Sequence, residues 1–154
     1  MKLAEALTAR ADLQRRIEQL RARITANARY QEGEEPAEDA AALIVEADAA
    51  LVALRDLIRR INATNSRLDL GPDGTMTDAL ASRDVLRLQH SLLTDAAAAA
   101  SGSAGAFRQM RSELRQVAAL PVAELRSRAD AVAQELRELD NRIQQANWSS
   151  ELEE

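Results

Sequence analysis

Apolar residues recur at alternating spacings of three and four along several stretches of the chain, and the last stretch shows the pattern most plainly. Residues 121–148 begin with Pro121 and end at Asn147-Trp148. Apolar positions with this spacing lie on one face of an α-helix. They are Leu125, Ala129, Val132, Leu136, Leu139 and Ile143. The pattern predicts a helix that forms one wall of a helical bundle.

Residues 2–29 repeat the same spacing, which predicts a first helix. Its stripe consists of Leu3, Ala6, Arg10, Leu13, Ile17, Leu20, Ile24 and Asn27. Two of these positions are polar. Near helix ends, Arg10 can reach solvent along its aliphatic stem and Asn27 can cap the backbone. A buried polar contact that fixes how helices align is the alternative.

Residues 40–67 carry the clearest heptad pattern and predict a second helix. Its positions are Ile44, Ala47, Leu51, Leu54, Ile58, Ile61 and Asn65, widened by Leu43, Ala50 and Leu57. Residues 68–74 contain the glycines and proline of a turn. The alternation around this turn leaves room for a short two-stranded element near 68–76 and 110–118. Residues 107–120 fit a helix or an extended segment equally.

A third helix is expected over residues 78–100, with Thr77 as its N-cap. It carries two apolar stripes. The first consists of Ala81, Val85, Leu88, Leu92, Ala96 and Ala99, and the second of Leu86, His90, Leu93, Ala97 and Ala100. A helix that is apolar on more than one side is buried in a bundle or contacts another chain.

The composition supports an all-α fold. Leucine, isoleucine, valine and alanine dominate the apolar residues, while the aromatic residues are only Tyr30, Phe107 and Trp148. Sheet proteins need more β-branched and aromatic side chains. We therefore expect a single domain over residues 1–154, an antiparallel bundle of about four long helices, with a flexible segment at 101–106 and a frayed acidic tail at 149–154.

Charge and cysteine content narrow the function classes. The net charge of −5 does not favour nucleic-acid binding. There is no cysteine, no signal-peptide pattern at the start and no run of 18 apolar residues, so we expect a cytoplasmic protein without a membrane span. Residues 2–29 are net positive and residues 30–61 net negative, which favours pairing of the first two helices.

The residues offer little catalytic chemistry, so we predict a non-enzymatic protein without a cofactor. His90 is the only histidine and has no cysteine or second histidine to work with. Carboxylates near the start of the second helix complement its dipole. A cation site is the weaker alternative, since the calcium-loop spacing is absent. Its ligands would be Glu32, Glu34, Glu35, Glu38 and Asp39.

Polar motifs that interrupt the apolar stripes, together with the second stripe of the third helix, are the candidate functional or interface surface. Trp148 is the most informative of them, because tryptophan contributes strongly to interfaces; a hydrophobic lid on the bundle end is the alternative. The candidates are Asn62, Asn65, Leu86, His90, Leu93, Arg137, Asp140, Asn147 and Trp148.

Several separated motifs resemble the septicolysin-like family of small bacterial proteins. They include residues 10–14, 31–36, 61–65, 77–80, 83–86 and 137–140, followed by Ile143-Gln144 and Asn147-Trp148. The resemblance implies a mostly helical fold and, from the family name, a pore-forming cytolysin. It supplies no catalytic residue.

We therefore expect a structural or assembly protein, a helical bundle that forms homo-oligomers through its apolar helix faces. A membrane-active protein and a metal- or ligand-binding bundle are the alternatives. No small-molecule substrate can be identified from the sequence.

Overall fold

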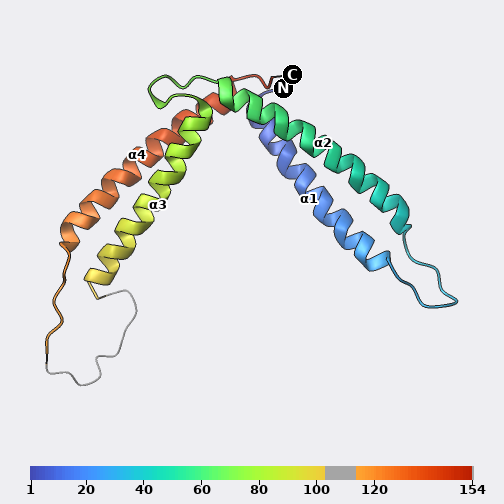
Figure 1. Cartoon of the computed structure of the whole chain (residues 1–154), viewed down its shortest axis with the longest axis horizontal. Helices are drawn as coiled ribbons and strands as arrows, with labels where there is room; N and C mark the ends of the chain where they lie inside the picture. Colours follow the sequence, from blue (N-terminus) through green and yellow to red (C-terminus); the bar gives the residue numbers. More distant parts are fainter. Residues whose placement is uncertain (103–113, 154) are drawn as a thin grey trace. The chain divides into compact units, whose positions relative to one another are not determined.

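The computed structural model describes residues 1–102 and 114–153, and the regular structure within them is helical (Figure 1). The helices are α1 (Leu3–Asn27), α2 (Ala40–Arg67), the single-turn 3-10 helix η1 (Gly71–Asp73), α3 (Met76–Ala100) and α4 (Val122–Ser149). The expected all-α class with four long helices is confirmed. The chain divides into two compact units, Met1–Leu68 with Gln145–Glu154, and Asp69–Gln144. A single domain over the whole chain stays a prediction.

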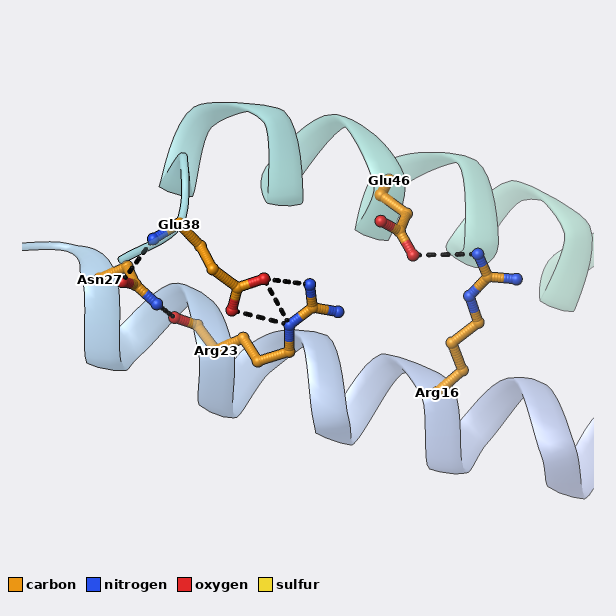
Figure 2. Close-up of polar contacts among 5 residues, drawn as sticks. All are labelled: Arg16, Arg23, Asn27, Glu38 and Glu46. Atoms are coloured by element: carbon orange, nitrogen blue, oxygen red, sulfur yellow. Dashed lines mark hydrogen bonds and ion pairs between the residues drawn. The ribbon is translucent and has the colours of Figure 1, made fainter. Parts of the chain in front are cut away.

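In the first unit, α1 and α2 lie side by side and run antiparallel (Figure 1). Two ion pairs connect α1 to α2 and to the residues just before it, as Figure 2 shows. Nη2 of Arg16 lies 2.9 Å from Oε1 of Glu46, and the Arg23 guanidinium binds the Glu38 carboxylate, with Nε 3.0 Å from Oε2. As the residue number rises along α1, the number of its partner falls. The pairs join the basic first helix to the acidic segment, as the charge distribution predicts.

The apolar stripe of α1 is the face that packs. Leu3, Ala6 and Leu20 are buried, and the other apolar positions of the stripe are half-buried. On α2 the buried residues include Leu43 and Ala50, which only widen the predicted heptad pattern. Of the heptad itself, Ile61 is buried, whereas Ile44 and Leu51 are about half exposed, so the packed face of α2 follows the heptad only toward its C-terminal end.

Asn27 secures the loop between α1 and α2. Its Nδ2 donates to the carbonyl of Arg23 at 2.9 Å, and its Oδ1 accepts the backbone N–H of Glu38 at 3.0 Å (Figure 2). The polar residue at the end of the α1 stripe thus acts as a cap that also holds the start of the next segment. The Asn27 side chain therefore does not make a buried contact with α2 that would fix how the two helices align.

The acidic tail is bound to the first unit, so the expectation that it frays is wrong for residues 149–153. Lys2 and Glu151 form an antiparallel bridge, with the Leu3 N–H donating to the Ser150 carbonyl at 3.0 Å and the Leu152 N–H to the Met1 carbonyl at 2.8 Å. The Leu152 side chain is buried. Apolar burial together with backbone hydrogen bonds outweighs the entropy of a free tail.

The second unit begins with a tight turn that leads into α3. The Leu70 N–H donates to the Gly74 carbonyl at 2.8 Å, and Thr75 caps α3. Oγ1 of Thr75 accepts the Asp78 N–H, while a carboxylate oxygen of Asp78 accepts the Thr75 N–H at 2.9 Å. This capping box places the start of α3 two residues before the predicted position, so Thr77 is not the cap.

The helices α3 and α4 pack against each other through apolar side chains. Leu93 and Ala97 of α3 are buried with Leu125, Ala129 and Val132 of α4, and Leu86 and Ala96 lie against this cluster. The face of α4 that packs is therefore the predicted stripe. On α3 the packing face is the second predicted stripe.

The predicted two-stranded element is not supported. Asp69 and Thr75 form one isolated bridge inside the turn, which is too short a stretch for a strand. Residues 114–120 have no strand or helix, and 110–113 lie outside the described residues. Of the segment expected to be flexible, Ser101 and Gly102 form a turn that ends α3, and 103–106 lie outside the described residues.

Candidate functional site

Part of the α2 heptad remains on the surface of the first unit. We call the residues Ile44, Ala47, Leu51, Leu54 and Ile58 the α2 seam. Ile44 and Leu51 are about half exposed, and the other three are half-buried. Since neighbouring residues of a helix point about 100° apart, the burial of Leu43 and Ala50 against α1 turns Ile44 and Leu51 away from it. The α2 seam thus borders the packed face without being covered.

More apolar surface adjoins the α2 seam. Val45 and Val52, two turns apart, are also exposed. Toward the C-terminal end of the helix the exposed surface becomes basic, because Arg55 and Arg59 follow. A single exposed apolar side chain is ordinary, but a contiguous apolar surface with a charged border is typical of a protein interaction site.

A second uncovered surface lies on α3. We call Val85, Leu88 and Leu92 the α3 stripe. Their exposed fractions are 61%, 72% and 66%, although the other side of the same helix packs against α4. On this helix Asp84 and Asp95 flank the stripe, and both are exposed. These three large side chains are therefore left uncovered by the described residues of their own unit (69–102 and 114–144).

The second stripe of α3 faces α4. It contains three of the candidate residues. Leu93 is buried in the core of this unit, and Leu86 packs at its edge. His90 is half-buried and lines an open groove of about 410 Å³ with Thr94, Arg126 and Asp130. This stripe is internal to the unit, so it is the first stripe, not the second, that is free to bind another chain.

Asp140 and Arg137, neighbours in the sequence, have different surroundings. Asp140 is half-buried and faces two arginines of α3, with Arg83 Nη1 at 3.9 Å and Arg87 Nη2 at 3.6 Å. Within the described part of the chain, the buried Nε of Arg83 has no hydrogen-bond partner. Arg137 is exposed. Asp140 thus stabilises the α3–α4 pair.

The four remaining candidates differ in exposure. Asn62 is exposed and Asn65 half-buried near the end of α2. On α4, Asn147 is buried, whereas Trp148 is 64% exposed. The Trp148 side chain is therefore not a lid over the core of its unit, because a lid would lose most of its exposed surface.

Two of the five carboxylates named as a weak cation site, Glu38 and Asp39, have structural partners. The hydrogen bonds from Arg23 lower the pKa of Glu38, so this carboxylate is held as an anion. Asp39 is the N-cap of α2 and accepts the N–H groups of Ala41 and Ala42. Glu32, Glu34 and Glu35 are exposed. Across residues 1–102 and 114–153, no three metal-ligating side chains are grouped so as to hold an ion.

Two polar contacts join residues far apart in sequence and could not be predicted from it. Arg142 of α4 binds Asp73 of η1, with Nε 2.5 Å from Oδ2, and these hydrogen bonds lower the pKa of Asp73. In the first unit, Arg60 Nε donates to the carbonyl of Glu153 at 2.8 Å. An arginine or a carboxylate alone carries no sequence signal for such a partner, because both are common on helix surfaces.

None of the helices in the described ranges has the length and apolar character that a membrane span requires. A comparison with curated proteins gives no match. Among solved structures, the chain is similar to a protein titled "Crystal structure of a functionally unknown conserved protein from Corynebacterium diphtheriae". The two are 38% identical, the match covers 99% of each chain, and the TM-score is 0.92.

The resemblance to the septicolysin-like family is wrong. Residues 10–152 match a different family, one of unknown function. The similar Corynebacterium structure is likewise described as functionally unknown. The pore-forming activity rested only on that resemblance and therefore has no support. The chain belongs to the family of unknown function DUF6847.

Proposed function

We propose that this protein is a non-enzymatic structural or assembly protein that associates with copies of itself through exposed apolar helix faces. The observation that carries the proposal is the α3 stripe, three large apolar side chains that are mostly exposed although the opposite side of their helix is packed. The α2 seam offers a second face of the same kind. Each helix pair is thus packed on one side and retains an apolar surface on another.

The energetic argument favours association. Completing the burial of a large apolar side chain that is half exposed contributes about 1–2 kcal/mol. Five such side chains, Ile44, Leu51, Val85, Leu88 and Leu92, lie on each copy, so a dimer that covers them all gains about 10–20 kcal/mol. Association costs about 4–15 kcal/mol in lost freedom. The gain is of the same order as the cost, so the exposed faces support association.

The polar candidates fit a structural role better than a chemical one. Asp140, Glu38 and Asp39 are engaged in ion pairs or a helix cap. His90 lies in an open groove beside Arg126 and Asp130. A location in the cytoplasm belongs to the same proposal and is supported by the lack of cysteine in the sequence.

Sedimentation equilibrium of two variants tests the proposal against the wild type. Leu88→Ser with Leu92→Ser removes most of the apolar α3 stripe and is expected to raise the dissociation constant at least a hundredfold, since burial of two leucines is lost in each copy. Thr8→Ser with Thr25→Ser on exposed positions of α1 is the control and leaves the mass unchanged. A wild type that is monomeric at every concentration contradicts self-association.

A further inference from the structure

We infer that the α2 seam of one copy pairs with the α3 stripe of a second copy. The inference rests on the proposed self-association and specifies which faces meet. Three pairings are open to two copies: α2 with α2, α3 with α3, or α2 with α3. Apolar content does not separate them, because both faces are aliphatic. Charge does.

The exposed face of α2 is basic toward its C-terminal end. Arg55 lies about one turn beyond Leu51, and Arg59 one turn further, both exposed. Asp48 is the acidic residue on this face and lies near its N-terminal end. The neighbouring carboxylate of Asp56 approaches Arg55 Nε at 3.2 Å, but both side chains stay more than half exposed. Arg55 and Arg59 therefore remain accessible to a partner.

The α3 stripe is bordered by acid. Asp84 lies next to Val85, and Asp95 lies less than one turn beyond Leu92; both are exposed. Asp84 forms loose ion pairs with two arginines of the same helix, with Arg83 Nη2 at 3.5 Å and Arg87 Nη1 at 3.9 Å. The Asp84 side chain keeps 66% of its surface exposed. This face thus presents apolar side chains with an anionic border.

Two α3 faces bring aspartates together whichever way the helices run, because Asp84 and Asp95 lie at the two ends of the stripe. Two parallel α2 faces bring arginines together. Antiparallel α2 faces place Arg55 near Asp48, but that pairing leaves the α3 stripe exposed or paired with its own acidic copy. Pairing α2 with α3 instead places the arginines near the aspartates and covers both apolar faces at once. Opposite charges at the border of an apolar contact select the partner and its orientation.

Pairing unlike faces is compatible with a closed dimer. In a dimer with twofold symmetry, the α2 seam of the first copy meets the α3 stripe of the second, and the α3 stripe of the first meets the α2 seam of the second. Each of the two contacts joins the α1–α2 pair of one copy to the α3–α4 pair of the other. Each contact then has two helices from each copy.

Charge reversal tests the pairing with two variants. The first is Arg55→Asp with Arg59→Asp, and the second is Asp84→Arg with Asp95→Arg. Each variant alone places like charges at both contacts, and we expect the dissociation constant of each to rise at least tenfold. Mixed in equal amounts, the two variants restore opposite charges at both contacts. The mixture is expected to form a heterodimer about as tightly as the wild type dimerises.

Sedimentation velocity at low salt, with one variant fluorescently labelled, gives the dissociation constants of the two variants and of their mixture. Arg21→Asp with Arg29→Asp, two exposed positions associated with α1, is the matched control and keeps the wild-type dissociation constant. Circular dichroism melts show that each variant is folded. Variants that dimerise as well as the wild type, or folded variants whose mixture stays monomeric, overturn the pairing while leaving self-association intact. A monomeric wild type overturns both.

Discussion

The backbone N–H of Glu153 donates a hydrogen bond of 3.0 Å to Oγ1 of Thr64, a residue 89 positions earlier in the chain. The Thr64 side chain is buried, and its hydroxyl donates in turn to the carbonyl of Arg60 at 2.9 Å. Arg60 binds the Glu153 carbonyl, and Arg67 Nη1 lies 2.5 Å from the Glu153 carboxylate. Three residues from the last two turns of α2 thus hold the end of the tail.

Thr64→Val is expected to destabilise the first unit by about 1–2 kcal/mol. Valine keeps the shape of the side chain but leaves the Glu153 N–H without its acceptor in a partly buried position. Urea unfolding followed by circular dichroism measures the loss. Thr8→Val is the control, because the Thr8 hydroxyl is exposed and bonds only to the carbonyl of Ala4 within its own helix. Equal unfolding midpoints for the two variants would argue against the tail contact.

The tail is also bound to the N-terminus through Glu151, and the pH dependence of stability reports on this contact. Hydrogen bonds from the Lys2 side chain and from the N-terminal amino group lower the pKa of Glu151. The folded state therefore holds the carboxylate as an anion more strongly than the unfolded chain does. Stability from this site is present above about pH 4.3, the ordinary pKa of glutamate, and is lost as the pH falls through the lower folded value.

Glu151→Gln removes this dependence, because the amide does not titrate. The variant is expected to be less stable than the wild type at pH 7, and the difference is expected to shrink as the pH falls toward 3. Thermal melts at closely spaced pH values give the comparison. Glu32→Gln changes the same charge on an exposed loop residue and serves as the control. A gap between wild type and Glu151→Gln that stays constant over this pH range would contradict the assignment.

The turn before α3 requires glycine at position 74. Gly74 has φ 76° and ψ −142°, a conformation that residues with a side chain rarely adopt. A Cβ atom there would lie 2.8 Å from Oδ2 of Asp78, the carboxylate of the α3 capping box. Gly74→Ala is expected to cost about 2–3 kcal/mol, from backbone strain and a disturbed cap.

Gly71→Ala is the matched control for this turn. Gly71 also has a positive φ, but a Cβ atom there meets nothing within 4 Å. Its cost is therefore limited to the backbone term of about 1 kcal/mol. Guanidinium unfolding of both variants separates the two contributions. If Gly71→Ala proves as harmful as Gly74→Ala, the close approach to Asp78 does not matter for stability.

Asn27 offers a test of the loop between α1 and α2. Asn27→Ala removes the acceptor of the Glu38 N–H and is expected to lower the unfolding free energy by about 1 kcal/mol. Hydrogen exchange should also become faster at the Glu38 amide, whereas Asn141→Ala, on an exposed position of α4, should leave that amide unchanged. Unaltered protection of the Glu38 amide in Asn27→Ala would show that the side chain does not hold the loop.

Helix positions and their packing faces could be predicted from the sequence where one stripe was unambiguous. The stripes of α1 and α4 both pack, because each helix has a single apolar face and the other faces are charged. The sequence pattern of α2 is wider, and its packed face changes along the helix: Leu43 and Ala50 are buried while Ile44 and Leu51 are exposed, but Ile61 of the heptad is buried. Periodicity shows that a helix is apolar on a given side, but not which of two adjacent sides a neighbour covers.

The sequence left open whether the second stripe of α3 is buried in the bundle or shared between chains. Leu93 is buried within the unit, and the first stripe is exposed. Two stripes of similar composition on one helix cannot be ranked without knowing where α4 packs. The binding of the acidic tail was missed for a similar reason, since a short charged end carries no periodic signal and its partners Lys2 and Thr64 are distant in sequence.

Solution mass tests the central claim most directly. Light scattering coupled to size-exclusion chromatography, on the wild-type chain of 16.8 kDa over a wide range of concentrations, measures the number of copies in the particle. Self-association through the α2 seam and the α3 stripe predicts a particle of twice the chain mass that dissociates on dilution. A particle with the mass of one chain at every concentration would contradict it.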